Sequence, residues 1–363
     1  MSDPTIQTFC CHHGNATNVA LTVMRTFDTD TYNIVCLCSS ALGVLGAVYQ
    51  ILPRKQFTNS HRWFSFPAER GRKIIIWLAV ADLLAALGVF IRSMIWITNK
   101  NIMPAINDDS SVFFCSISSA LIQYFYTSTC IWTLCYAIDM RLILAQKECK
   151  LRYYHMAAWI IPALLTSSGL CLLYYPDADC HAILSFETIL FRFVPNYIAT
   201  YLPIFVVMIA NPILYHNSMG DMKRIITSAS GQLTSRERSI LDAISLKFSV
   251  IMGVFYLCWI PNLVNGLLVW VLWFELPSDV LIVVWNIMAF TNPLQAFFNS
   301  LVYRRWYSGS ERVILPWRYY DEAEYTPRNS QLTRSSKDSG RDEGYPLLPG
   351  GPLKSINGYQ SLP

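Results

Sequence analysis

Apolar residues in this sequence gather into seven long runs, and shorter polar, often basic, segments separate them. The runs extend from Tyr32 to Leu52, Ile74 to Ile97, Val112 to Ile138, His155 to Tyr175, Asn196 to Tyr215, Leu246 to Leu272 and Val280 to Tyr303. As an α-helix, each run is long enough to cross about 30 Å of hydrocarbon. Apolar and polar residues do not alternate within them, as they would in the strands of a membrane barrel. The pattern therefore predicts an all-α membrane protein with seven transmembrane helices, because a helix satisfies its own backbone hydrogen bonds in lipid.

Composition agrees with this fold class. The chain is 53% hydrophobic and only 14% charged, whereas soluble domains are about 25% charged. The first 31 residues lack an apolar stretch of about 7 to 15 residues, so we expect no cleavable signal and expect the first helix to direct insertion. We divide the chain into an N-terminal arm (1–31), a helix bundle (32–303) and a tail (304–363).

The distribution of Lys and Arg predicts the orientation. Segments on one side of the membrane carry fifteen such residues, in groups of six (53–73), four (141–152) and five (223–247). The other side carries only Arg25, Lys100 and Arg192. The positive-inside bias therefore places the N-terminus in the lumen or outside the cell and the tail in the cytosol. The net charge of +4 then reflects topology and contact with lipid, and we expect no nucleic-acid partner.

Four of the eleven cysteines fall on the lumenal side, where disulfides can form, namely Cys10, Cys11, Cys115 and Cys180. Cys115 opens the third helix and Cys180 follows the fourth. We expect a disulfide between them, which would fix the second lumenal loop over the bundle; the alternative is two free thiols. Asn15 begins Asn-Ala-Thr on the same side and is a candidate glycosylation site.

Polar residues within the spans are candidate functional residues, because they are costly in lipid. Asp82 lies in the middle of the second span, where it indicates either a water or cation pocket or a protonated carboxyl bonded between helices. Thr129 is a further polar residue, in the third span. Interior prolines predict hinges at Trp259–Pro261 and Asn292–Pro293, because proline removes a backbone hydrogen bond.

Together these features resemble the G-protein-coupled receptor superfamily. The shared features are seven spans, LAVAD in the second (78–82), CWIP in the sixth (258–261), Asn-Pro in the seventh and an Asp at the inner end of the third. The resemblance implies a lumenal ligand site, a sixth helix that swings outward, and an inner crevice for a G protein or arrestin, faced by Asp139 and Arg141.

The sequence departs from the superfamily pattern in three places, one of which is that the first span lacks the Asn expected there. Asp139-Met140-Arg141 replaces Asp-Arg-Tyr, which turns the arginine about 100° around the helix and puts its usual contact with the sixth helix in question. The Asn-Pro of the seventh span is followed by Phe297, one place beyond the usual Tyr.

Four further segments are similar to the ocular albinism type 1 family, the melanosomal receptors of pigment cells. They are TFCC (8–11), CYAIDM (135–140), LLYYP (172–176) and TYLPIFVVMIANPIL (200–214). This resemblance implies residence in melanosomes and lysosomes, a response to tyrosine, L-DOPA or dopamine, and signalling through heterotrimeric G proteins and arrestin. It also implies control of melanosome biogenesis, size and transport.

Candidate ligand contacts follow from charge. Ile122 stands where amine receptors of this superfamily place an acidic counter-ion, so a simple monoamine would lack that anchor. Arg92 lies about 15 Å above Asp82 along the helix, where it either pairs with a ligand carboxylate or extends to the lumenal interface. Four neighbouring candidates are polar or aromatic: Gln123, Tyr124, Trp259 and Asn262.

The tail is rich in Ser, Pro, Gly and charges, and we expect it to be disordered beyond a short amphipathic stretch around Arg304 to Leu315. It contains two matches to the tyrosine-based sorting pattern, Tyr345 with Leu348 and Tyr359 with Leu362, and an acidic dileucine of Glu343 with Leu347 and Leu348. These motifs predict clathrin adaptors as partners and residence in lysosome-related organelles.

Two other classes of protein were weighed. A secondary transporter or channel is the alternative function, because Asn211-Pro212 and Asn292-Pro293 resemble helix breaks at the midplane. An enzyme is not expected, because the spans contain no pair of His at metal-binding spacing. A light-sensing pigment is not expected either, because the seventh span has no Lys for a Schiff base. The sequence predicts no metal and no cofactor.

Overall fold

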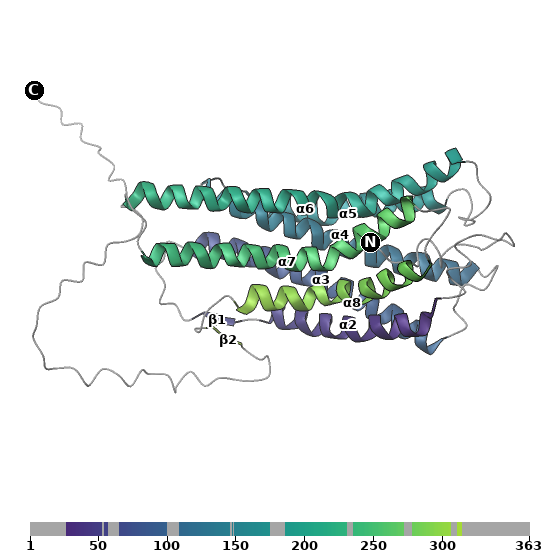
Figure 1. The fold of residues 1–363 in the computed structure, drawn as a ribbon. Helices are drawn as coiled ribbons and strands as arrows, with labels where there is room; N and C mark the ends of the chain where they lie inside the picture. Colours follow the sequence, from purple (N-terminus) through teal and green to yellow (C-terminus); the bar gives the residue numbers. More distant parts are fainter. Residues whose placement is uncertain are drawn as a thin grey trace, which may run out of the picture.

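The computed structural model of the chain describes residues 27–52, 54–56, 65–99, 109–145, 147, 149–174, 186–230, 235–271, 278–305 and 311–313. These residues form seven helices whose long axes align in one bundle (Figure 1). The helices are α2 (Thr29–Ile51), α3 (Ser65–Thr98), α4 (Asp109–Leu144), α5 (Leu151–Tyr174), α6 (Phe186–Ser230), α7 (Ser235–Val271) and α8 (Ser278–Arg305). They match the seven predicted spans in order, which confirms the all-α seven-helix fold. We use "N face" for the end of the bundle where α2 begins and "C face" for the end where α8 ends.

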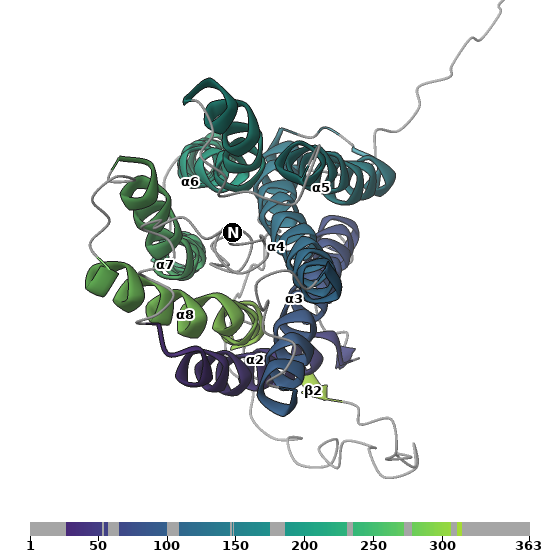
Figure 2. The ribbon, with the colours of Figure 1, turned by 90° about the vertical axis from the view of Figure 1, so that its right-hand side faces the viewer.

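The helices form a ring with one helix outside it. Around the ring each helix contacts the next in the order α2, α3, α4, α6, α7 and α8, and α8 contacts α2. The remaining helix, α5, packs on α4 and α6 (Figure 2). Two hydrophobic clusters fill the bundle. One cluster contains Trp259 and Trp285. The other contains Trp132 and Phe248, together with Tyr136 and Tyr154.

Six of the seven helices have the length and hydropathy of a membrane span, and α4 is not among these six. The side chains that lower the hydropathy of α4 face other helices instead of lipid. Its buried polar or charged residues are Ser119, Gln123, Thr127, Ser128, Thr129, Thr133 and Asp139. Because α4 contacts α3, α5 and α6, these side chains lie against protein, and this part of its surface has no need to be apolar.

The helices extend beyond the apolar runs that predicted them. α6 begins at Phe186 and ends at Ser230, and α7 begins at Ser235, whereas the sequence predicted spans of 196–215 and 246–272. Hydropathy marks only the length inside hydrocarbon, and backbone hydrogen bonding continues in water where no residue stops it. At its start α2 is capped by Asp28, whose Oδ1 accepts hydrogen bonds from the backbone N–H groups of Asp30 and Thr31 at 3.1 and 3.3 Å.

A short antiparallel ribbon joins two segments at the C face. β1 (Arg54–Gln56) follows α2, and β2 (Glu311–Val313) follows α8, with Arg54 paired to Val313. β2 lies within the stretch from Arg304 to Leu315 that the sequence analysis excepted from disorder. Residues 306–310 and the tail from 314 onward lie outside the described residues, so the expected disorder stays a prediction.

Small residues let α2 approach α8 closely. A methyl group on Gly43 would overlap the carbonyl oxygen of Pro293, and one on Gly46 would lie 2.5 Å from Cα of Phe297. Ser39, one turn from Gly43, donates a hydrogen bond to the Ala289 carbonyl at 2.8 Å. The seam between α2 and α8 is thus a backbone-to-backbone contact of the kind that Gly and Ser allow in membrane helices.

We expect Gly43→Ala to destabilise the bundle by about 1–3 kcal/mol, because the Pro293 carbonyl cannot move away without shifting α8. The matched control is Gly253→Ala on α7, where an added methyl group meets nothing within 4 Å; it should be neutral or slightly stabilising. Thermal unfolding of both purified variants in detergent would measure the difference, and equal melting temperatures would contradict the close-contact argument.

Candidate functional site

Buried polar side chains occur at three levels of the bundle. Arg92 lies toward the N face, Asp82 in the middle and Asp139 toward the C face, and each is at most 3% exposed. A buried charge in a membrane protein needs partners on neighbouring helices. The partners of these three side chains on neighbouring helices therefore decide what each level of the bundle can do.

At the middle level, Asp82 on α3 is bonded to α8. Its Oδ2 accepts a hydrogen bond from Nδ2 of Asn299 at 2.8 Å, and the Thr129 hydroxyl of α4 faces the same carboxyl group. Asp82 thus joins three helices, as expected for a carboxyl group bonded between helices. Within the described residues, no cluster of three or more His, Cys, Asp and Glu is placed to hold a metal ion.

The partner of Asp82 corrects our reading of the seventh span. The superfamily's Asn-Pro motif, which ends in Tyr four residues after the Asn, fits the sequence better seven residues after Asn292. Asn299 and Tyr303 have this spacing, and Ser300 stands in the place of the proline. Both are buried, and the Tyr303 ring packs edge-on against Tyr136 of α4 at 5.6 Å. Asn299 was missed because no proline follows it; the four-residue spacing to Tyr303 was the available signal.

Asn292 and Asn262 instead pair with each other across α7 and α8. Asn262 Nδ2 donates to Asn292 Oδ1 at 2.8 Å, and Asn292 Nδ2 donates back to Asn262 Oδ1 at 3.2 Å. Each lies beside a helix proline, Pro261 or Pro293. Asn262 was predicted to contact ligand; in this structure its amide is used in the interhelical pair at the two kinks.

At the N-face level, Arg92 points into the bundle. Its side chain is 3% exposed, so it does not extend to the interface as one of the two interpretations required. Tyr126 of α4 lies close enough for an electrostatic interaction with it. The Tyr126 ring meets Trp259 edge-on at 5.6 Å, so Arg92 and Trp259 border the same tyrosine.

Of the predicted neighbours on α4, Gln123 faces inward and Tyr124 does not. Gln123 is fully buried and donates from Nε2 to the Thr200 hydroxyl of α6 at 2.9 Å. Tyr124 lies on the seam with α5, where its hydroxyl donates to the Trp159 carbonyl at 3.3 Å. Tyr126 was missed, although its spacing of three from Gln123 and Thr129 places it on the inward face of the helix.

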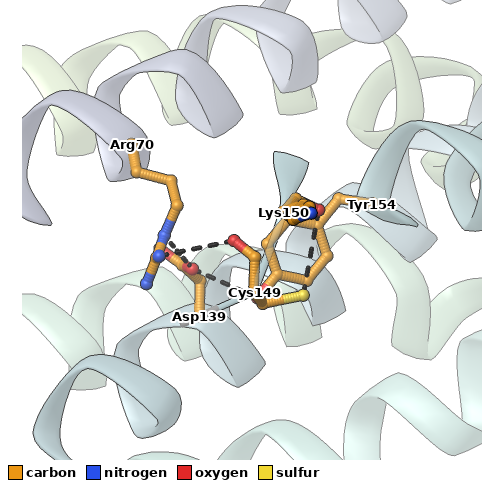
Figure 3. A network of polar contacts seen from close by, with 5 residues as sticks. All are labelled: Arg70, Asp139, Cys149, Lys150 and Tyr154. Carbon is orange, nitrogen blue, oxygen red and sulfur yellow. Dashed lines mark hydrogen bonds and ion pairs between the residues drawn. The ribbon is translucent and has the colours of Figure 1, made fainter. Parts of the chain in front are cut away.

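At the C-face level, Asp139 is enclosed by α3 and α5 (Figure 3). Nε of Arg70 lies 2.7 Å from Oδ1 of Asp139, and the Tyr154 hydroxyl donates to the same oxygen at 3.1 Å. Arg70 also donates from Nη1 to the Cys149 carbonyl at 3.4 Å. Burial raises the pKa of the Asp139 carboxyl, just beyond the predicted third span, and the Arg70 guanidinium and Tyr154 hydroxyl oppose that rise.

This network changes the interpretation of Asp139 and Arg141. Asp139 is 0% exposed, so it does not face a partner protein. Arg141 lies on another side of α4, where it forms an ion pair with Asp221 of α6, and the side chains are 35% and 29% exposed. Its partner is on the fifth span, not the sixth. Arg70 was missed because it stood among the basic residues used only for orientation.

The remaining predicted residues fall partly outside the described chain. Cys115 is disulfide-bonded, and every other described cysteine is a free thiol, so its partner is not among the described residues. Cys180, Asn15, and the sorting residues Glu343, Tyr345, Leu347, Leu348, Tyr359 and Leu362 all lie outside them.

Comparison with known proteins places the chain among receptors. A family model described as ocular albinism type 1 protein matches residues 1–326. G-protein coupled receptor 143 of Homo sapiens is 29% identical over 325 residues, covering 84% of this chain and 78% of that protein. Cyclic AMP receptor-like protein A of Dictyostelium discoideum is 22% identical over 271 residues, covering 73% of this chain and 62% of that protein.

We expect Arg70→Met to destabilise the protein by about 3–5 kcal/mol, because it leaves the buried Asp139 carboxyl without its cation. Adding Asp139→Leu should recover much of this loss. Arg141→Met is the matched control, since an exposed pair contributes about 1 kcal/mol or less. Melting temperatures of the variants would test this, and similar losses for Arg70→Met and Arg141→Met would contradict it.

Proposed function

This chain belongs to the ocular albinism type 1 family and is a G-protein-coupled receptor, and from that premise we propose that it responds to tyrosine, L-DOPA or dopamine in melanosomal and lysosomal membranes. As a receptor of this type it is a multi-pass membrane protein, not an enzyme, and it couples a small-molecule ligand to a heterotrimeric G protein. The proposal concerns the ligand, the compartment and the further partners.

Arg92 is the observation that carries the ligand proposal. A guanidinium buried among helices of an otherwise apolar bundle is a strong partner for a carboxylate, which it binds by two parallel hydrogen bonds. Tyr126 and Trp259, which lie beside it, offer ring faces and edges to an aromatic side chain. An aromatic amino acid has both the carboxylate and the ring, whereas dopamine has the ring alone. We therefore favour tyrosine or L-DOPA over dopamine.

The compartment and topology follow from charge and from the tail. The basic segments between spans support a cytosolic C face and a lumenal N face. The paired tyrosine motifs and the acidic dileucine support clathrin adaptors as partners and delivery to melanosomes, late endosomes and lysosomes, with some protein at the plasma membrane. In this arrangement arrestin and a G protein meet the C face, and signalling regulates melanosome biogenesis, size and transport.

A transporter or channel is less favoured. Transporter binding sites are commonly built from helices broken near the midplane. Here α6 passes through Pro203 and Pro212 without interruption, and α8 passes through Pro293 in the same way. The prolines therefore mark positions within continuous helices.

We expect Arg92→Gln to raise the half-maximal concentration for L-DOPA and tyrosine by about 10- to 100-fold, since a hydrogen bond to a charged group is lost. The response to dopamine, which lacks the carboxylate, should change little. G-protein recruitment by receptor held at the cell surface would measure both, with Arg152→Gln, an exposed cation at the C face, as the control. Equal losses for L-DOPA and dopamine would show that Arg92 is structural.

We expect Ala substitution of Tyr345, Leu347, Leu348 and Tyr359 to move the receptor to the plasma membrane, because adaptor binding requires both the tyrosine and the bulky apolar residue. The matched control is Tyr325→Ala, a tail tyrosine followed three places later by Arg328. Surface labelling of intact cells would quantify the shift. Continued vesicular staining of the fourfold variant would reject the sorting role.

A further inference from the structure

Prolines inside membrane helices create a specific demand for hydrogen-bond donors. Proline has no N–H, so the carbonyl four residues before it loses its helical partner, and lipid offers no replacement. The described helices contain six interior prolines: Pro162, Pro195, Pro203, Pro212, Pro261 and Pro293. Each freed carbonyl therefore needs a donor from a side chain, either of its own helix or of a neighbouring one.

Three of these carbonyls accept a hydroxyl from another helix. Ser128 of α4 donates to Ala158, four residues before Pro162, and Ser39 of α2 donates to Ala289, four before Pro293. Tyr256 of α7 donates to Met208, four before Pro212 on α6. All three distances are 2.8 Å.

The other interhelical bonds of this type are longer. Among described residues of the seven spans, two more side chains donate to a backbone carbonyl of a different spanning helix. Tyr124 reaches Trp159 at 3.3 Å, and Gln50 reaches Ile75 at 3.4 Å. Neither acceptor stands four residues before a proline. Among these five bonds, the three of 2.8 Å are therefore the ones whose acceptor is a carbonyl freed by a proline.

Tyr256 differs from the two serines in where it lies. Pro261 lies inside the continuous helix α7, and Tyr256 lies between that proline and the C face. Its bond to Met208 therefore ties the C-face part of α7 to α6. The stacked rings of Tyr215 and Phe248, with centroids 4.4 Å apart, join the same two helices. If this part of α7 moves away from α6, the Met208 carbonyl loses its donor, and Pro212 cannot supply one.

We propose that the Tyr256 hydroxyl is a latch that holds α7 against α6 and thereby opposes the arrangement that admits a partner at the C face. This inference rests on the proposed receptor function, because it concerns the helix movement that couples ligand to G protein. Tyr256 is a positioning residue: it acts on the balance between two arrangements of the bundle. Ser128 is the matched static case, because its bond joins α4 to α5.

The latch can be tested without any transducer. Spin labels on cysteines introduced at the exposed residues Lys223 of α6 and Arg238 of α7 would report the distance between the two helices at the C face in detergent or nanodiscs. We expect Tyr256→Phe to increase the population with the longer distance by about three- to tenfold, the range for losing one hydrogen bond between membrane helices. Ser128→Ala should leave the distribution unchanged.

The role of the proline is tested by a double-mutant cycle. In a Pro212→Ala background the helix regains the N–H that Met208 needs, so Tyr256→Phe should have a much smaller effect on both the distance distribution and the melting temperature. An equal effect in both backgrounds would overturn the assignment of Tyr256 to the freed carbonyl. A lower melting temperature with unchanged distances would overturn the latch and leave a structural bond.

Signalling provides a separate comparison. Basal G-protein recruitment should rise in Tyr256→Phe by a factor similar to the rise in the longer-distance population. If the wild-type receptor recruits no G protein with any agonist, the proposed function fails, while the label distances still decide whether the latch exists. If distances change but recruitment falls, the Tyr256 bond does not oppose the coupling arrangement.

Discussion

The hydrogen bonding of backbone carbonyls in a medium without water is the constraint on which this bundle depends. Six prolines lie inside the described helices, and each removes a donor that lipid cannot replace. At Ala158, Met208 and Ala289 a hydroxyl of the adjacent helix supplies it. These bonds tie a particular neighbouring helix to each of the three positions, and at Ala289 the neighbouring Gly43 brings α2 close enough for Ser39 to reach. Proline, small residue and hydroxyl therefore act together across two helices.

The same constraint explains how α4, the one of the seven described helices without the hydropathy of a membrane span, can belong to the bundle. α4 has protein on several sides, so its Ser, Thr and Gln side chains find partners instead of lipid. Gln123 reaches α6, Ser128 reaches α5, and Thr129 faces Asp82 of α3. Polar residues that would be costly on a lipid-facing surface are tolerated here, because these three lie against another helix. Low hydropathy in one of the seven spans is thus compatible with a place in the bundle when its polar side chains face protein.

The sequence predicted the number and order of the helices because hydropathy is a local property that the bilayer thickness turns into length. It also identified Asp82 and Arg92 as residues whose burial needs an explanation, since a charge within a span is costly whatever surrounds it. Asp139 was identified through the resemblance to the receptor superfamily. The sequence did not predict their partners, Asn299, Tyr126 and Arg70, which lie on other helices and depend on how those helices are turned and staggered. The Asn-Pro pair at 292 and 293 did not point to Asn299 as the partner of Asp82, because the height of Asp82 relative to α8 is set by packing. Tyr124 was similarly assigned to the interior without counting the helix face from Gln123.

At the C face the displacement of one arginine has a mechanical consequence. With Met140 between them, Asp139 and Arg141 point about 200° apart around α4, and each finds its opposite charge on a different helix. Asp139 is buried with Arg70 of α3 and Tyr154 of α5, whereas Arg141 pairs with Asp221 of α6 in partial contact with solvent. Breaking a buried pair leaves an uncompensated charge, while an exposed pair can exchange its partner for water at little cost. The side of the C face formed by α3, α4 and α5 is therefore the rigid one, and α6 is held to α4 by a bond that water can replace. Separation of helices at the C face is least costly along α6 and α7, where the Arg141 pair and the Tyr256 hydroxyl are the polar contacts to be exchanged.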